Sequence, residues 1–248
     1  MVFQGTVLGP ILWNIFYSDV RHPVRKRFFT ETIFADDLNC FKNYARTIGD
    51  NYIMKQMKLC QEEVHQWGKA NRVQFDPAKE HFFVLNRKCR GHDNFEILGA
   101  LFDTKLSMFK EICRLASETS KKMRRLVRVK RYYSIPDLIR LYKAHVLPYA
   151  ERTTPAIFHS HPNSLAWLYR IQDDFSEELQ VSKTDALLNF NLAPLSARRS
   201  ISMLGLLHRT QLGIAPPMLS SFSRMQKAQC IIIVWVAVLV ITSKSFVM

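Results

Sequence analysis

Hydrophobic residues recur at helical spacing in the first part of the chain. Proline is favoured at the first position of a helix, so Gly9-Pro10 predicts a helix start, and the apolar positions that follow share one face. A second helix is expected from Asp50, whose side chain could cap it. Its apolar positions are spaced by four, three, four and three residues: Ile53, Met57, Cys60, Val64 and Trp67. Such spacing is typical of a face that packs into a core.

Two short runs rich in aromatic and β-branched residues lie between these helices, at 28–35 and 38–44. Only Asp36-Asp37 separates them, so the pattern predicts a β-hairpin with an acidic tip. Two further strands are predicted at 81–85 and 95–103, the second interrupted by Gly99 as a bulge or a tight bend.

The pattern changes to helices from Phe109 onward. The first predicted helix is strongly basic and covers 110–131. Ser134 and Pro136 are expected to cap and open the next helix, which Pro148 should end. The sequence therefore predicts a mixed α+β part followed by an all-α part.

Two later helices are predicted at 165–179 and 196–212, after a connector that contains Pro155 and Pro162. Beyond them, Cys230–Ile241 is a continuous apolar run. A helix that spans a membrane needs about 20 apolar residues. The run is shorter, so it favours a buried strand, or sequence read past the original domain, over a membrane anchor, and no stable membrane anchor is expected.

The charge of the chain changes this picture. The sequence has 35 Lys and Arg against 21 Asp and Glu, a net charge of +14. Residues 110–152 hold 12 basic and 4 acidic side chains, which is +8 of that excess. A clustered basic segment indicates a nucleic acid or an anionic membrane surface as partner. A solvated face that serves only solubility is the alternative.

The cysteines and the first residues of the sequence indicate the cellular location of the protein. The five cysteines are odd in number and widely spaced, without a C-x-x-C motif. This usage is typical of reduced thiols in an intracellular protein, and His159-Ser-His161 fits a loop better than a zinc site. The start lacks the basic and apolar regions of a secretory signal. We expect an intracellular protein, in the nucleus or the cytoplasm, that is not secreted.

The acidic tip is the feature of the sequence that points most directly to a reactive or metal-binding site. Adjacent carboxylates repel each other unless a cation neutralises them, and Mg²⁺ is typically held by one or two carboxylates together with substrate phosphates. Asp is also favoured in turns for its local hydrogen bonds. From these residues alone, Asp36-Asp37 is either a metal site or an ordinary turn.

Four blocks in order decide between these interpretations, because together they resemble a known family. They are Gln4–Pro10, Phe34–Asp37, Phe75–Lys79 and Phe95–Gly99. In this arrangement, residues 3–222 resemble the reverse transcriptase domain of non-LTR, LINE-type retrotransposons. The resemblance implies a partial right-hand polymerase palm, with a catalytic hairpin, a helix and antiparallel strands, followed by an all-α thumb and connection.

The resemblance also implies boundaries and roles. The segments would be a palm at 1–108, a thumb at 109–152, a connection at 153–222 and a tail at 223–248. Asp36 and Asp37 would be catalytic and would bind Mg²⁺ or Mn²⁺. Gln4, Gly5 and Lys79 would contact the nucleotide and template, and Leu98 and Gly99 would grip the primer. The partners would be an RNA template and a DNA primer.

One departure from the family bears on activity. Its other essential aspartate comes from a strand before the Gln-Gly block, and this sequence begins at Met1 without it. Asp19 and Asp103 are poor replacements, because one falls late in a helix and the other ends a strand. We therefore expect an N-terminally truncated fragment that is inactive by itself. An unpaired strand edge around 30–35 should make it poorly soluble.

A basic module that binds nucleic acid without catalysis is the alternative function. Its backbone contacts would come from seven cations: Lys121, Lys122, Arg124, Arg125, Arg128, Lys130 and Arg131. Tyr132 and Tyr133 follow them and could stack on bases. The sequence leaves the oligomeric state and enzyme activity open.

Overall fold

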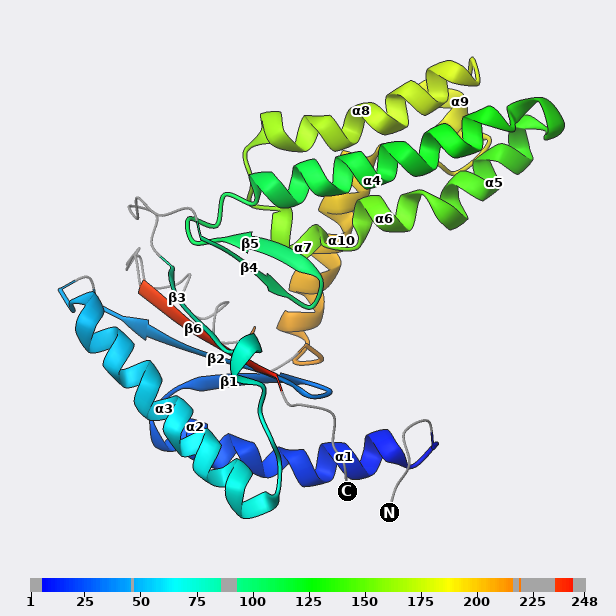
Figure 1. The fold of residues 1–248 in the computed structure, drawn as a ribbon. Coiled ribbons are helices and arrows are strands. Elements are labelled where there is room, and N and C mark those ends of the chain that lie inside the picture. Colours follow the sequence, from blue (N-terminus) through cyan, green and yellow to red (C-terminus); the bar gives the residue numbers. More distant parts are fainter. Residues whose placement is uncertain (1–5, 46, 86–92, 216–218, 220–234, 243–248) are drawn as a thin grey trace. The chain divides into compact units, whose positions relative to one another are not determined.

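The computed structural model describes the chain except residues 1–5, 46, 86–92, 216–218, 220–234 and 243–248 (Figure 1). Helices and antiparallel strands both occur, so the expected α+β class is confirmed. The chain forms two compact units, one of residues 1–93 with 231–248 and one of residues 94–230. This division falls before the predicted strand at 95–103 rather than after it, and the four expected segments remain a prediction.

The first unit contains a four-stranded antiparallel sheet with the strand order β1-β2-β6-β3. The strands are β1 (Thr30–Phe34), β2 (Asp37–Tyr44), β3 (His81–Leu85) and β6 (Trp235–Thr242). The predicted acidic hairpin is formed by β1 and β2. β1 lies at the edge of the sheet, as expected for the segment around 30–35.

β6 comes from the far end of the chain and lies between β2 and β3. It pairs with β2 from Asp37↔Thr242 to Tyr44↔Trp235, and with β3 from His81↔Val240 to Leu85↔Val236. The strand predicted in the apolar run is confirmed for these residues, while 230–234 lie outside the described residues. No helix in the described part of the chain is long and apolar enough to cross a membrane.

The helices of the first unit pack an aromatic and aliphatic core. They are α1 (Gly9–Tyr17), the 3₁₀ turn η1 (Ser18–Val20), α2 (Arg21–Lys26), α3 (Asp50–Asn71) and the 3₁₀ turn η2 (Pro77–Lys79). The predicted face of α3 is confirmed, since Ile53, Met57, Cys60 and Val64 are buried and Trp67 packs against them.

The predicted cap of α3 is wrong. Gly49 occupies the cap position in an extended conformation, and Asp50 is already the first helical residue and makes no capping hydrogen bond. The Asp50 carboxylate still lies in the first turn, where the helix dipole favours a negative charge.

The second unit joins a short hairpin to a set of helices. Its strands are β4 (Asn94–Ile97) and β5 (Ala100–Asp103), which pair around the predicted bend at Gly99. Its helical elements are α4 (Phe109–Arg128), η3 (Lys130–Tyr132), α5 (Ile135–His145), α6 (Leu147–Glu151), α7 (Thr154–Ile157), α8 (Pro162–Glu178), α9 (Lys183–Leu188) and α10 (Leu195–Gln211).

Three details of these helices differ from expectation. The basic helix ends at Arg128, and a 3₁₀ turn follows it. α5 ends at His145, and Pro148 lies in the first turn of α6, where its missing N–H costs nothing. The short helix α9 has no counterpart in the sequence prediction. The predicted cap of α5 is confirmed, because the Ser134 hydroxyl accepts the Asp137 N–H at 3.4 Å.

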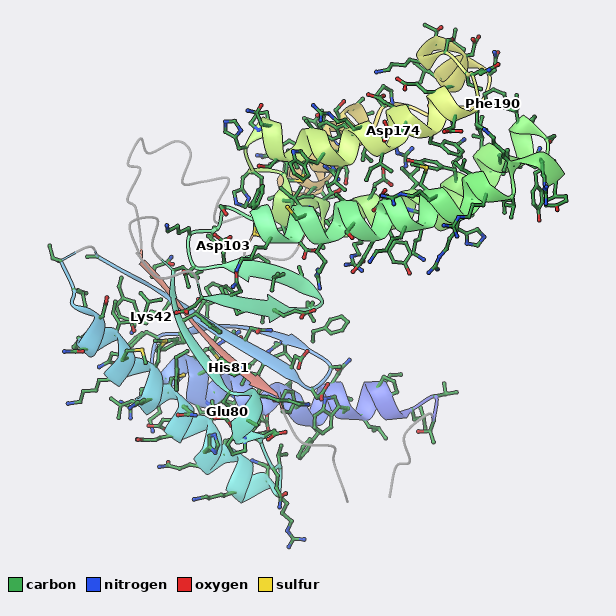
Figure 2. All side chains as sticks on the ribbon, turned by 45° about the horizontal axis from the view of Figure 1, so that its top comes forward. Lys42, Glu80, His81, Asp103, Asp174 and Phe190 are labelled. Carbon is green, nitrogen blue, oxygen red and sulfur yellow. The ribbon has the colours of Figure 1, made fainter. Side chains whose placement is uncertain are left out.

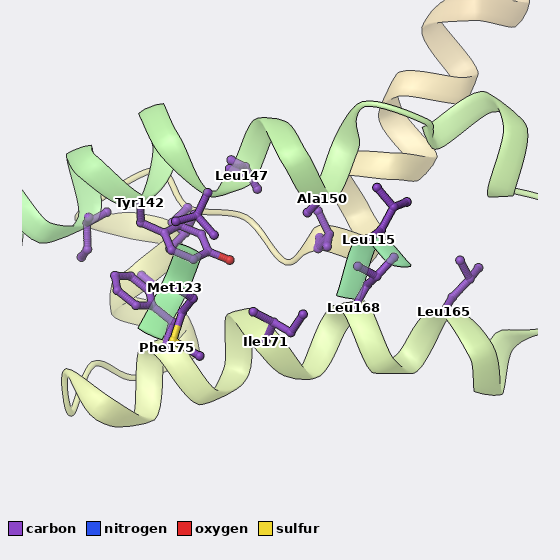
Figure 3. Packing of buried hydrophobic residues seen from close by; sticks show 14 of the residues in the cluster. Leu115, Met123, Tyr142, Leu147, Ala150, Leu165, Leu168, Ile171 and Phe175 are labelled. Atoms are coloured by element: carbon purple, nitrogen blue, oxygen red, sulfur yellow. The ribbon is translucent and has the colours of Figure 1, made fainter. Parts of the chain in front are cut away.

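The core of the second unit lies between α4, α5, α6 and α8 (Figure 3). The rings of Tyr142 and Phe175 stack with centroids 4.2 Å apart, and Leu115 and Leu168 are fully buried. This core fixes the buried side of α4 and leaves its opposite side to solvent.

Candidate functional site

The acidic turn joins two paired strands. Phe34 and Asp37 are the last pair of the β1–β2 ladder, so only Ala35 and Asp36 form the connection. Ala35 has a φ of 53°, in the left-handed region that costs a residue with a side chain roughly 1–2 kcal/mol. Asp36 is exposed, whereas Asp37 is half-buried at the start of β2.

Aromatic side chains from α1 lie next to this turn. The indole Nε1–H of Trp13 donates to the Ala35 carbonyl oxygen at 2.8 Å. The Trp13 ring stacks on Tyr17 with centroids 4.8 Å apart, and Tyr17 meets Trp67 of α3 edge to face at 5.7 Å. The turn is thereby connected to the core of the first unit.

The Tyr17 hydroxyl lies in the field of the acidic pair. Burial raises its pKa far above the ordinary value for tyrosine, and the Cys40 thiol and the carboxylates of Asp36 and Asp37 raise it further. The phenol therefore stays protonated and neutral beneath the two carboxylates. Its hydroxyl is buried without a hydrogen-bond partner among the described residues.

The ladder register brings Lys79 to the same end of the sheet as the acidic turn. Val240 of β6 pairs with His81, and Thr242, two residues further along β6, pairs with Asp37. Lys79 ends η2, just before β3 begins at His81, so it lies at the same end of the sheet as Asp37. Its side chain is exposed at the end of η2.

The neighbouring Glu80 is occupied by protein partners. Its carboxylate, labelled beside His81 in Figure 2, contacts His65 Nε2 at 2.9 Å and accepts a hydrogen bond from Gln61 Nε2. Only 3% of this side chain is exposed, so it serves to tie α3 to the start of β3. Lys79 and Glu80 are adjacent in sequence but differ in their availability to a ligand.

The acidic pair fits a hard cation. Neither Asp36 nor Asp37 forms a hydrogen bond or ion pair with the residues that the structure describes, so both offer carboxylate oxygens, the ligands that Mg²⁺ and Mn²⁺ prefer. Within the described residues there is no cluster of three or more His, Cys, Asp or Glu side chains that could hold a metal. The donor set therefore fits one cation with further ligands from water or substrate.

The other residues considered for the site, as nucleotide contacts or as poor replacement ligands, have different positions. Gln4 and Gly5 lie outside the described residues. Asp19 lies in η1. Asp103 accepts hydrogen bonds from the backbone N–H groups of Ser107 at 3.1 Å and Met108 at 2.9 Å. Burial raises the pKa of Asp103, but these hydrogen bonds outweigh burial, and the pKa lies below the ordinary range. Its carboxylate thus closes the loop before α4.

The Leu98-Gly99 turn belongs to the second unit. Both residues have positive φ, 50° and 77°, and the Leu98 side chain is 54% exposed at the tip. Arg114 of α4 donates to the Gly99 carbonyl, and the same guanidinium meets Glu111 at 2.6 Å. Glu111 is fully buried and also accepts the Leu101 N–H at 3.1 Å. This pair fixes the turn to the first part of α4.

The N-terminal part of the chain is similar to a known protein family. Residues 1–102 match the model of the reverse transcriptase (RNA-dependent DNA polymerase) family. This segment contains the acidic turn, Lys79 and the Leu98-Gly99 turn. Reverse transcriptase domains bind an RNA template and a primer, and the family generally uses divalent metal ions. No curated protein and no solved structure matches the chain significantly.

The basic helix follows directly after the reverse transcriptase-like segment. Four of its predicted cations recur at helical spacing on one face and line a shallow hollow of about 240 Å³: Lys121, Arg124, Arg125 and Arg128. We call these four residues the α4 stripe. All four are exposed. Arg114 precedes Lys121 by two turns on the same face, so the stripe begins near the Leu98-Gly99 turn.

Within the stripe, Arg124 donates to the neutral Ser120 hydroxyl at 3.0 Å. The other three predicted cations contact aromatic or acidic side chains. Lys122 lies over the Tyr149 ring, with Nζ 3.8 Å from the centroid. Lys130 is ion-paired with Glu178 at 2.8 Å, and Arg131 packs on the ring of Tyr132. Tyr132 and Tyr133 are exposed. Of the seven cations named from the sequence, the α4 stripe is therefore the part best placed for an anionic ligand.

Acidic residues of α8 border one side of the α4 stripe. A cleft of about 750 Å³ has Arg124, Arg128 and Lys130 along one wall. The facing residues include Asp174, Glu177 and Glu178, all exposed (Asp174 is labelled in Figure 2). Because carboxylates repel anions, the side of the stripe that carries Lys121 and Arg125 is more favourable for an anionic ligand than the side that faces α8.

Sequence analysis missed the residues that hold the two turns. Trp13 and Tyr17 fall in the helix predicted from Gly9-Pro10, and Glu111 and Arg114 fall in the predicted basic helix, but none of the four was given a role. For Glu111 a signal was present, because it stands beside Ile112 and one turn before Leu115 on the buried side of the helix. No comparable signal marked Trp13, since an aromatic residue on an apolar helix is usual.

Proposed function

We propose that the chain derives from the RNA-directed DNA polymerase of a non-LTR, LINE-type retrotransposon. The palm would cover 1–108, with the thumb at 109–152, the connection at 153–222 and the tail at 223–248. The observation that carries the proposal is the Asp36-Asp37 turn, which lies inside the reverse transcriptase match at the same end of the sheet as Lys79. A location in the nucleus or cytoplasm fits this origin.

Each side chain has a role in nucleotidyl transfer under this proposal. Asp36 and Asp37 would hold Mg²⁺ or Mn²⁺, which when bound neutralises charge on the reacting phosphates. Lys79 would place a cation near the triphosphate, where negative charge develops. The Leu98-Gly99 turn would hold the primer end. The α4 stripe would bind the phosphate backbone of the template and primer.

The isolated chain is proposed to lack polymerase activity. Transfer by two metal ions requires carboxylates from more than one strand, so that both ions are clamped about 3.5–4 Å apart. The residue that pairs with Asp37 on β6 is Thr242. No cluster of three or more His, Cys, Asp or Glu side chains occurs among the described residues, so under this proposal the further carboxylate comes from outside them.

Primer extension tests the proposal directly. The full chain is incubated with an RNA template, a DNA primer and Mg²⁺ or Mn²⁺, beside the variants Asp36→Ala and Asp19→Ala. Asp19 is an exposed carboxylate outside the turn and serves as the matched control. No extension is expected from any of the three. Extension that Asp36→Ala abolishes and Asp19→Ala preserves would refute the proposed inactivity and support the site.

Binding of the divalent ion tests the site without catalysis. Mn²⁺ is titrated into the same three proteins and followed by electron paramagnetic resonance. Weaker binding is expected in Asp36→Ala, and unchanged binding is expected in Asp19→Ala. Equal binding by all three proteins would contradict a metal site at the acidic turn.

Nucleic-acid binding without catalysis is the second candidate function. The α4 stripe favours it, because the stripe concentrates exposed cations on one helical face. The affinity for an RNA–DNA hybrid should fall steeply with salt, and each lost phosphate contact should lower the slope by roughly 0.7–0.9. We therefore expect Lys121→Gln with Arg125→Gln to reduce the slope by about 1.5.

The controls for this experiment separate the two functions. Asp36→Ala should bind the hybrid like the original chain, because it leaves the α4 stripe intact. Lys183→Gln removes an exposed cation from α9 and should change the slope little. An affinity that does not depend on salt would exclude the binding function.

A further inference from the structure

The backbone at Ala35 needs support from outside the hairpin. Its φ of 53° is disfavoured for alanine, and glycine is the usual residue in such a turn. A turn of two residues has few hydrogen bonds of its own. Without an external contact, the Ala35-Asp36 peptide would be free to rotate, and the Asp36 carboxylate would move with it.

The Trp13 indole supplies such a contact. Its Nε1–H lies 2.8 Å from the Ala35 carbonyl oxygen. The Ala35 carbonyl and the Asp36 N–H belong to one planar peptide group. Holding this oxygen therefore fixes the orientation of the peptide plane that leads into Asp36.

The indole itself is held by the core of the first unit. It stacks on Tyr17 with an interplanar angle of 18°, and it meets Phe16 with centroids 5.9 Å apart. Both of these rings also contact Trp67 of α3, at 5.7 and 6.1 Å. Tyr17 is only 1% exposed, so the support behind the indole is buried. A donor on a ring packed in this way has little freedom to leave its acceptor.

We propose that Trp13 is a positioning residue that clamps the acidic turn through its indole N–H. The clamp sets the backbone from which Asp36 and Asp37 reach their ligand. Its effect on metal binding rests on the proposed function, whereas its effect on the turn does not. Trp13 touches no reacting group, so it acts only through the Ala35 peptide.

A pair of matched variants tests the clamp in the full chain. Trp13→Phe keeps an aromatic ring in the stack but removes the N–H. Trp67→Phe makes the same change in the same aromatic cluster, on a side chain that makes no hydrogen bond to the turn. Both variants lose a similar amount of packing, so only a hydrogen-bond effect distinguishes them.

Amide hydrogen exchange at residues 34–38 is the primary measurement. A single hydrogen bond of ordinary strength corresponds to about a fivefold change in the population of the open turn. Exchange should be about fivefold faster in Trp13→Phe and unchanged in Trp67→Phe. Unchanged exchange in Trp13→Phe would overturn the proposal, and so would equal acceleration in both variants, because packing alone would then be responsible.

Mn²⁺ titration of the same proteins separates the clamp from the metal site. Binding several-fold weaker in Trp13→Phe than in Trp67→Phe is expected. If exchange accelerates only in Trp13→Phe and none of the proteins binds Mn²⁺, the clamp on the turn is supported and the metal role of Asp36 is refuted. If the original chain binds Mn²⁺ and both variants bind it equally well, the clamp does not position the metal ligands and that part of the proposal is overturned.

A measurement on the unchanged chain keeps the test valid if Trp13→Phe does not fold. The indole N–H resonance of Trp13 is assigned with ¹⁵N-labelled tryptophan, and its exchange with solvent is measured. Protection relative to the Trp67 indole is expected. Exchange as fast as that of a solvated indole would overturn the proposal.

Discussion

The Glu111 carboxylate offers the sharpest test of how the second unit is held together. It is fully buried, and its Oε2 accepts hydrogen bonds from the Leu101 N–H at 3.1 Å and from Arg114 Nε at 2.9 Å. Its other oxygen, Oε1, is buried without a partner among the described residues. Replacing Glu111 therefore affects both the β4–β5 hairpin and the guanidinium of Arg114.

The expected cost follows from the groups left behind. Glu111→Ala leaves the Leu101 N–H without its acceptor and Arg114 without its closest counter-charge. Breaking a buried pair in this way typically costs about 3–5 kcal/mol. Arg114 is 30% exposed and keeps Glu96 at 3.6 Å, so the lower end, about 3 kcal/mol, is expected. Glu111→Gln keeps one acceptor and should cost about 1–2 kcal/mol.

Urea denaturation of the full chain, monitored by circular dichroism, measures these differences. Glu118→Gln on the same helix is the control, because that side chain is 38% exposed and should change the unfolding free energy by less than about 1 kcal/mol. Equal costs for Glu111→Ala and Glu111→Gln would refute the assignment to hydrogen bonding. A cost below about 1 kcal/mol for Glu111→Ala would refute the importance of the buried pair.

Three further predictions concern acid stability, nucleic-acid affinity and the sheet. The lowered pKa of Asp103 means that its contribution to stability is complete above the ordinary Asp value near 3.9 and is lost as pH falls through the lower folded value. Asp103→Asn should therefore destabilise the chain at pH 7 in thermal melts, and this difference should shrink as the pH falls below the ordinary Asp value. Glu177→Gln with Glu178→Gln removes two negative charges beside the α4 stripe and should raise hybrid affinity about two- to fivefold at low salt in fluorescence anisotropy, with no gain at high salt. Val238 of β6 lies opposite Phe41 of β2 on one side and Phe83 of β3 on the other. Val238→Pro removes a hydrogen bond from this central strand and should lower the unfolding free energy, measured in urea, by about 3 kcal/mol or more. An unchanged midpoint would contradict the central position of β6.

The sequence predicted those elements whose signal is local. Proline at position 10, the spacing of apolar residues in α3 and the two strand-like runs around Asp36-Asp37 all determine structure over a few residues. The boundaries that differed depend on backbone details, such as the extended conformation at Gly49 and the start of a new helix at Pro148. Either Gly49 or Asp50 could have been the cap residue of α3, and Pro148 could have ended one helix or begun the next. Only the folded backbone distinguishes these possibilities.

The candidate site was predictable only in part for the same reason. Asp36 and Asp37 can be recognised from the sequence alone, and so can the cations of α4. Their surroundings depend on pairings between distant segments. Trp13 contacts Ala35, and β6 joins β2 to β3 so that Lys79 and Asp37 lie at the same end of the sheet. Nor could the pattern of charges separate Lys121 and Arg125 from Lys122 and Lys130, because the difference lies in Tyr149 and Glu178, which come from other helices.

The place of β6 also determines the order in which the molecule can be completed during synthesis. β2 and β3 leave the ribosome long before their common neighbour, since Tyr44 and Trp235 are roughly 190 residues apart in the chain. The second unit is translated within that interval and can fold from its own residues. Throughout this time the first unit has two strands whose facing edges lack a partner, a state in which chains associate readily. Expression at low temperature or with chaperones should therefore improve the yield of folded chain, because the facing edges of β2 and β3 are exposed only until β6 has been translated and has paired with them.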